Sequence, residues 1–283
     1  MRRVARLACQ LAALIAVAAP ASCQPESLVL DVPYVHQVYD VPEWFDGRCS
    51  CGAACVVMVL AYYGVLPPWP CNCSEPFPHV SLYGCYVACR FRVGGFVFDE
   101  RAPDATRVRY ARGVHGFIYV PGVGASWGRI VRLFEIFGFN ATVDSDPTWE
   151  ELVRELREGR PVILSTDMTG SGHLVVAVGY AGEGVVVVND PAGDISLGYF
   201  NYEGRRALYD WPGYDGGHPS LVRVKAMILV RPTPRLRRAE PLGECGGESA
   251  AGELLAVMAA YLISASAMLA LWAADRRQRV VSS

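Results

Sequence analysis

An uninterrupted apolar stretch runs from Gly52 to Tyr63 and contains neither proline nor a second glycine. It stops at Gly64, and glycine commonly ends helices because it adopts a left-handed backbone without strain. An apolar run of this length without a polar face is typical of a helix that is buried all round. The pattern therefore predicts a buried helix over residues 52–63.

Two further segments show helical periodicity. The stretch from Trp127 to Phe137 repeats large apolar residues at helical spacing, namely Ile130, Leu133, Phe134 and Phe137. The stretch from Trp149 to Glu158 begins with the capping-box pattern of Thr148 and Glu151 and stops at Gly159. Both segments are expected to be helices with one face on the core.

The second half of the chain has a strand pattern. Short apolar runs rich in β-branched residues predict strands over 161–166, 173–180, 185–190 and 222–230, and residues 28–35 predict a short entry strand. Residues 181–184 have the composition of a hairpin turn between two of these strands. Helices followed by an antiparallel sheet predict an α+β domain over residues 27–230.

A segment from 67 to 124 lacks clear periodicity and is rich in proline, glycine and cysteine. It is predicted to be a cysteine-rich insertion on the surface of the domain. Two roles stay open for it: it shapes a substrate cleft, or it is a stabilising flap.

The first 23 residues have the pattern of a secretory signal. Three arginines precede an apolar run from Leu7 to Ala19, and small residues follow it. An uncleaved membrane anchor is the alternative. Lipidation of Cys23 is disfavoured, because Pro20 stands where a lipidation signal has leucine.

Near the other end, residues 254–274 carry no charge and are long enough to cross a bilayer as a helix. They follow a polar stalk over 231–253 and precede a basic tail over 275–283. With an export signal at the start, the pattern predicts a single-pass protein of the cell membrane, with its domain outside and its tail in the cytoplasm.

Composition narrows the partners. The formal net charge is −2, which gives no indication of nucleic-acid binding.

Four of the ten cysteines, Cys71, Cys73, Cys85 and Cys89, lie in the insertion. In an exported protein such density favours disulfides over a zinc site, although their pairing cannot be deduced from sequence. Oligomeric state cannot be deduced either.

Three residues suggest thiol chemistry. Cys51 stands at the start of the predicted buried helix, whose dipole favours a thiolate. His173 opens one predicted strand and Asp190 ends the next, so antiparallel pairing places them at the same sheet edge. His173 is then the candidate base and Asp190 the group that orients it. Gly52 is expected to let a substrate backbone approach closely.

An oxyanion needs hydrogen-bond donors, and the Cys51 backbone amide is one. Gln37, upstream of the candidate nucleophile, is the candidate for the second donor. No metal or cofactor is required. Each residue alone has an ordinary explanation: a structural cysteine, a strand histidine, a turn aspartate before Pro191. Their order and spacing together favour catalysis.

These residues resemble a known family. Gln37, the Cys51-Gly52-Ala53-Ala54 segment with its helix, Gly172-His173 and Asn189-Asp190-Pro191 look like papain-like cysteine peptidases of the bacteriocin-leader-processing (double-glycine) type. The resemblance implies a papain-like fold, a peptide or protein substrate, and Cys51, His173, Asp190 and Gln37 as nucleophile, base, orienting residue and oxyanion donor. No transporter segment accompanies the domain, and the insertion has no counterpart in the resemblance.

Two alternatives stay open. The same thiol can transfer an acyl group to an amine or cleave a non-protein amide. Alternatively, a disulfide from Cys51 to Cys49 or Cys55 would leave a catalytically silent binding module.

Overall fold

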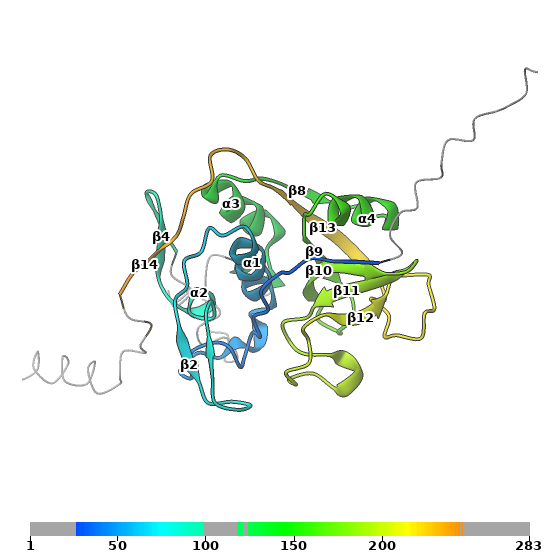
Figure 1. Ribbon diagram of the computed structural model, residues 1–283, viewed down its shortest axis with the longest axis horizontal. Helices are drawn as coiled ribbons and strands as arrows, with labels where there is room; N and C mark the ends of the chain where they lie inside the picture. Colours follow the sequence, from blue (N-terminus) through cyan, green and yellow to red (C-terminus); the bar gives the residue numbers. More distant parts are fainter. Residues whose placement is uncertain (1–26, 99–117, 121–123, 244, 246–283) are drawn as a thin grey trace, which may run out of the picture.

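The computed structural model describes residues 27–98, 118–120, 124–243 and 245 (Figure 1). The predicted signal over 1–23 and the predicted membrane helix and tail over 254–283 lie outside these residues. Within the described part of the chain, no helix is long and apolar enough to span a bilayer. The α-helices are α1 (Cys51–Tyr62), α2 (Cys85–Ala88), α3 (Trp127–Phe137) and α4 (Trp149–Arg157).

A seven-stranded antiparallel sheet forms the second half of the domain (Figure 1). Its strand order is β12-β11-β10-β9-β13-β8, and β1 pairs with the far end of β10. The strands are β1 (Ser27–Val29), β8 (Asn140–Asp144), β9 (Val162–Thr166), β10 (His173–Ala181), β11 (Val185–Asn189), β12 (Ala207–Asp210) and β13 (Val224–Arg231).

The central contact of the fold is between α1 and β10. Residues 52–61 of α1 are all buried, and so are residues 173–180 of β10. Side chains of β10 alternate between two cores: Val176 and Val178 pack in the core that contains α1, whereas Val175 and Ala177 pack with α4 on the other face. The sheet is therefore covered on both faces, with α1 and α4 on opposite sides.

The predicted helices agree with the structure to within a residue or two. Thr148 caps α4 as the sequence indicates, because its hydroxyl accepts a hydrogen bond from the Glu151 amide at 3.2 Å. Gly138 ends α3 in a left-handed conformation, with φ 94°.

The sheet differs from prediction at its margins. The entry strand is shorter than expected, since β1 ends at Val29, although the Leu30 amide still donates to the Val178 carbonyl at 2.7 Å. Strands β8 and β12 were not expected from the sequence. Both are short and partly polar, so neither has the continuous apolar pattern that marks the central strands.

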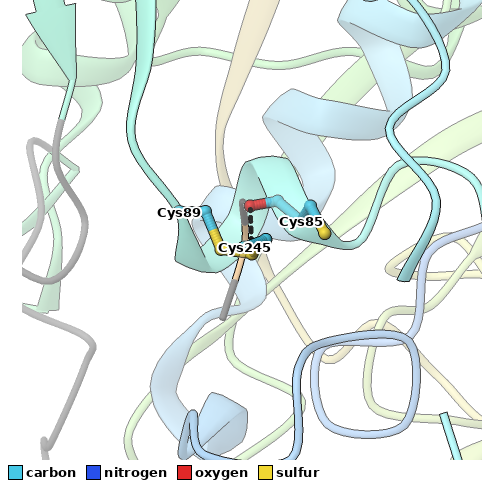
Figure 2. A group of neighbouring side chains, drawn as sticks. All are labelled: Cys85, Cys89 and Cys245. Atoms are coloured by element: carbon cyan, nitrogen blue, oxygen red, sulfur yellow. Dashed lines mark hydrogen bonds between the residues drawn. A yellow bond between two sulfur atoms is a disulfide. The ribbon is translucent and has the colours of Figure 1, made fainter. Parts of the chain in front are cut away.

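The region predicted as an insertion contains small elements in its described parts. They are β2 (Cys71–Cys73), β3 (His79–Ser81), α2, β4 (Phe91–Val93), β5 (Phe96–Phe98), β6 (Tyr119–Val120) and β7 (Gly124–Ala125). The late strand β14 (Glu240–Pro241) pairs with β4. A disulfide joins Cys89, at the end of α2, to Cys245, with their Cα atoms 5.6 Å apart (Figure 2). The segment after the domain is thus fastened back onto it.

Gly52 has a packing role that differs from the expected contact with substrate. A Cβ atom built on Gly52 would lie 2.8 Å from the Ala125 side chain and 3.1 Å from Ile118. Because Gly52 has no side chain, Ala125 of β7 and Ile118 can pack closely against the first turn of α1.

Gly52→Ala should consequently destabilise the domain by about 1–3 kcal/mol, because the added methyl overpacks this contact. The measurement is urea unfolding. Gly128→Ala on α3 is the matched control, since a Cβ there meets nothing within 4 Å. That variant should be neutral or more stable by up to about 1 kcal/mol. Equal unfolding midpoints for Gly52→Ala and the wild type would contradict the packing role.

Candidate active site

Cys51 is the first residue of α1, and its thiol lies beside the start of β10. Its sulfur interacts with the His173 side chain and accepts hydrogen bonds from the backbone N–H groups of Leu174 and Gly52. The free N–H groups and dipole of a helix N-terminus favour a negative charge at this place. Three donors therefore converge on the sulfur.

His173 and Asp190 form the second link. The Nε2 atom of His173 lies 2.7 Å from Oδ1 of Asp190, and both residues are buried. With Nε2 directed at Asp190, Nδ1 is the ring nitrogen that remains for Cys51. The antiparallel pairing of β10 with β11 produces this proximity, with Val176 opposite Asn189 and a bulge between Ala177 and Gly179. The structure thus brings together Cys51, His173 and Asp190.

Asp190 is held on every side. Its Oδ1 also accepts from the Ala192 amide at 2.9 Å, and its Oδ2 accepts from the Tyr209 hydroxyl at 2.9 Å. Its backbone carbonyl accepts from the Tyr34 hydroxyl at 2.8 Å. These contacts hold the carboxylate of Asp190 in one position, so that it can orient the imidazole ring of His173.

The electrostatics of the pair favour a thiolate and an imidazolium. Burial raises the pKa of Cys51, but the hydrogen bond and charge of His173 and the two amides outweigh it, so this pKa lies below its ordinary value. Burial lowers the pKa of His173, but the charge and hydrogen bond of Asp190, with the contribution of Cys51, raise it to about 10. The two shifts agree in direction, as an ion pair requires.

Gln37 lies in the wall of the same cavity, but its amide is engaged. Its Nε2 donates to the carbonyls of Gly47 at 3.0 Å and Arg48 at 2.7 Å. Donation to an oxyanion would require at least one of these bonds to be exchanged. The oxyanion role of Gln37 therefore stays a prediction, and the Cys51 backbone amide is the donor already placed at the head of α1.

A cavity of about 790 Å³ opens above the thiol. One wall comes from the α1 and α3 side of the molecule and the other from β9, β10 and the loop after β11. Its lining includes Cys51 and His173, the small residues Gly124, Ala125 and Ser126, and the side chains of Trp127, Tyr199, Phe200, Arg48 and Lys225. The cavity is large enough for several residues of an extended peptide.

No disulfide joins Cys51 to the cysteines beside it, Cys49 and Cys55. The sulfurs of Cys49, Cys51 and Cys55 are all free in the structure. Cys55 lies one turn further along α1, and burial raises the pKa of its thiol well above the ordinary value. Cys51 is thus the member of this group whose surroundings favour ionisation.

Several groups at the site are not evident from the sequence. The Leu174 amide reaches the sulfur because β11 ends opposite Val176, short of this residue. Tyr209 reaches Asp190 from β12, a strand that the pattern did not reveal. A backbone N–H group cannot be recognised as a site donor from the sequence, because every residue except proline has one. A tyrosine in a short strand gives only a weak indication of a role at the site.

A helix that presents a thiol to an imidazole on an antiparallel sheet is the arrangement of papain-like cysteine peptidases, and this α+β domain has it. The model of the Peptidase_C39 like family matches residues 29–211, well over half of the chain. The protein therefore belongs to this family of cysteine-type peptidases. The search of curated proteins found no match.

Solved structures with similarity to the chain carry related descriptions. One, from Bacillus anthracis, is named as a C39-like peptidase; it has 17% identity and a TM-score of 0.43, covering 74% of this chain and 100% of its own. Another is a prointerpain A fragment from Prevotella intermedia, with 16% identity, a TM-score of 0.33, and coverage of 73% and 72%.

Asp190→Asn tests the electrostatic arrangement without any substrate. Loss of the carboxylate charge should lower the pKa of His173 from about 10 and raise the pKa of Cys51, because the thiolate loses its charged partner. The rate of Cys51 alkylation, followed against pH by peptide mapping, should show its acid-side inflection at least about one unit higher than in the wild type.

Asp194→Asn is the control, because Asp194 caps the Ser196 amide rather than bonding His173. Its alkylation profile should match the wild type. If Asp190→Asn also left the profile unchanged, the assigned source of the pKa shifts would be wrong.

Proposed function

We propose that the protein is an exported, membrane-anchored peptidase that hydrolyses peptide bonds through Cys51, His173 and Asp190. The observation that carries the proposal is the continuous chain of interactions from the Cys51 sulfur through His173 to Asp190 at the floor of a peptide-sized cavity.

The reaction follows from the geometry. The Cys51 thiolate attacks the scissile carbonyl carbon, and the Cys51 amide at the head of α1 donates to the resulting oxyanion. His173, already protonated in the ion pair, gives its proton to the leaving amine. A thioester on Cys51 remains in the cavity.

His173 then acts as a base. It takes a proton from water, which attacks the thioester, and it keeps that proton as the Cys51 thiolate leaves, so that the ion pair is restored and the new acid is released. Asp190 keeps the imidazole oriented through both stages, because its Oδ1 stays at 2.7 Å from Nε2 and its Oδ2 is held by Tyr209.

Cys51→Ala and His173→Ala should each reduce peptide hydrolysis by about 10³-fold or more, since either change removes a reacting group. The assay is the release of fragments from a mixture of unstructured peptides, read by mass spectrometry. Cys49→Ala is the matched control, because Cys49 lines the same cavity and lies outside the ion pair.

The outcomes separate the candidates. Fragments that vanish only in the Cys51 and His173 variants support hydrolysis. Products that carry an added amine in place of water would instead identify an acyl transferase using the same thioester. Residual cleavage that is equal in Cys51→Ala and wild type would assign the activity elsewhere.

The proposed location rests on the sequence. The basic and apolar start of the chain and the uncharged stretch over 254–274 predict a domain outside the cell and a tail inside. A reporter that is active only in the cytoplasm should be active when fused after Ser283, whereas a reporter that is active only outside the cytoplasm should be inactive there. Protease added to intact cells should digest the domain. A protected domain would contradict the proposed orientation.

A further inference from the structure

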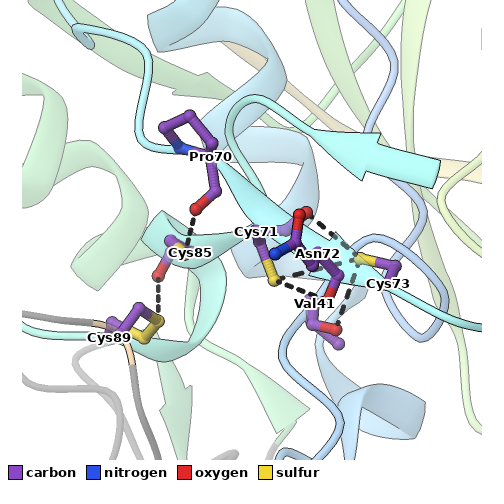
Figure 3. Close-up of a disulfide and its surroundings, with 8 residues drawn as sticks. Val41, Pro70, Cys71, Asn72, Cys73, Cys85 and Cys89 are labelled. Carbon is purple, nitrogen blue, oxygen red and sulfur yellow. Dashed lines mark hydrogen bonds between the residues drawn. A yellow bond between two sulfur atoms is a disulfide. The ribbon is translucent and has the colours of Figure 1, made fainter.

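Three buried thiols lie together on the side of α1 that faces away from the sheet. Cys71 and Cys73 are the ends of β2, and Cys85 begins α2, four residues before the disulfide-bonded Cys89. All three are free thiols and all are buried. Figure 3 shows Cys71 between Cys85 and Cys73. The reaction proposed for Cys51 uses none of them.

Their sulfur atoms are close. Cys73 and Cys71 have their sulfurs 3.9 Å apart. The thiol of Cys85 interacts with that of Cys71 and raises the pKa of Cys71. The Cys85 sulfur also lies 3.7 Å from the carbonyl of Pro70, the residue before β2. The start of α2 is therefore in direct contact with the start of β2.

We propose that Cys71 and Cys85 form a second disulfide when the protein matures in an oxidising compartment. A protein or small-molecule disulfide is the oxidant. One thiol of the pair forms a mixed disulfide with it and releases one thiol. The other thiol then attacks the mixed disulfide, completes the Cys71–Cys85 bond and releases the second thiol. Two protons and two electrons pass from the pair to the oxidant.

Cys73 is a poorer partner for Cys71, although their sulfurs are near. The two residues are two positions apart on one strand, where the Cα separation of about 6.6 Å is at the upper limit for a disulfide. Their backbones also pair with Ser81 and His79 in the hairpin, and a bond between them would distort that pairing.

A metal at the neighbouring sulfurs is disfavoured by the bonding already present. Cys85, Cys89 and Cys245 have their sulfur atoms within 4.8 Å of one another (Figure 2). Two of the three share a disulfide, and a disulfide sulfur carries no thiolate for a metal. Cys85 is left as the thiol of this group that can still react.

The second disulfide would join two very short elements. Helix α2 spans Cys85–Ala88 and β2 spans Cys71–Cys73, lengths that are marginal without tertiary support. With both bonds formed, α2 would be linked to the hairpin at one end and to Cys245 at the other. The β2–β3 hairpin and the segment that contains Cys245 would then both be covalently attached to α2.

The hairpin in turn contacts the loop that holds Gln37. His79 of β3 lies 2.8 Å from Oδ1 of Asp40, and Oδ2 of Asp40 accepts from the His36 amide at 2.6 Å. Asp40 also accepts from the Tyr202 hydroxyl at 2.6 Å. Fastening the hairpin therefore stabilises the loop before the nucleophile through a buried carboxylate.

The test uses the full chain, exported to a bacterial periplasm and purified in detergent. The protein is alkylated without reduction and digested with chymotrypsin, which cleaves after Tyr83 and Tyr86 and so separates Cys85 from Cys71 and from Cys89. The expected product is a Cys85 peptide linked to the peptide that contains Cys71 and Cys73, lost on reduction. Cys73→Ser should keep this link, and Cys71→Ser and Cys85→Ser should each lose it.

Thermal unfolding gives a second readout. Because the bond closes a loop of about 15 residues, Cys71→Ser and Cys85→Ser should melt roughly 5–10 °C below Cys73→Ser. The proposal is overturned if Cys85 is alkylated in the unreduced wild type, or is found linked to Cys89 or Cys245. It is equally overturned if Cys71 is linked to Cys73, or if the thiols become reactive only after a chelator removes zinc.

Discussion

The packing of α1 against β10 is the constraint on which the rest of the molecule depends. Both elements are buried along almost their whole length, so neither can slide without exposing apolar surface. This contact fixes the N-terminus of α1 beside the first residue of β10. The Cys51 sulfur therefore meets His173 and the Leu174 amide as a consequence of core packing.

Charges inside such a core are costly unless each is compensated. Here each charged group is compensated by the next group along a chain that begins at the Cys51 sulfur. The thiolate has an imidazolium and two amides, the imidazolium has Asp190, and Asp190 has Tyr209 and the Ala192 amide. The Gly52 amide belongs to α1 itself, whereas the other partners come from β10, β12 and the loop after β11. The sheet therefore provides a rigid electrostatic support for a nucleophile that the helix carries.

The cysteine-rich region is attached to the same core from the opposite side of α1. Its short elements pack in the cluster that contains α1, and the Cys89–Cys245 disulfide ties the segment after the domain to them. Through Asp40 this region also reaches the loop that carries Gln37. This region, expected to lie on the surface of the domain, thus packs on the core and contacts the loop that carries Gln37 in the cavity wall.

The sequence by itself determined the elements whose signals are local. The apolar run of α1, the capping box of α4, the central strands and the order of Cys51, His173 and Asp190 are all legible, because periodicity and hairpin spacing act over a few residues. The short strands β8 and β12, the Tyr209 contact and the filled space at Gly52 are not. The same holds for the engaged amide of Gln37 and the choice among cysteine partners. These depend on segments far apart in the chain, and only the folded core decides which of them meet.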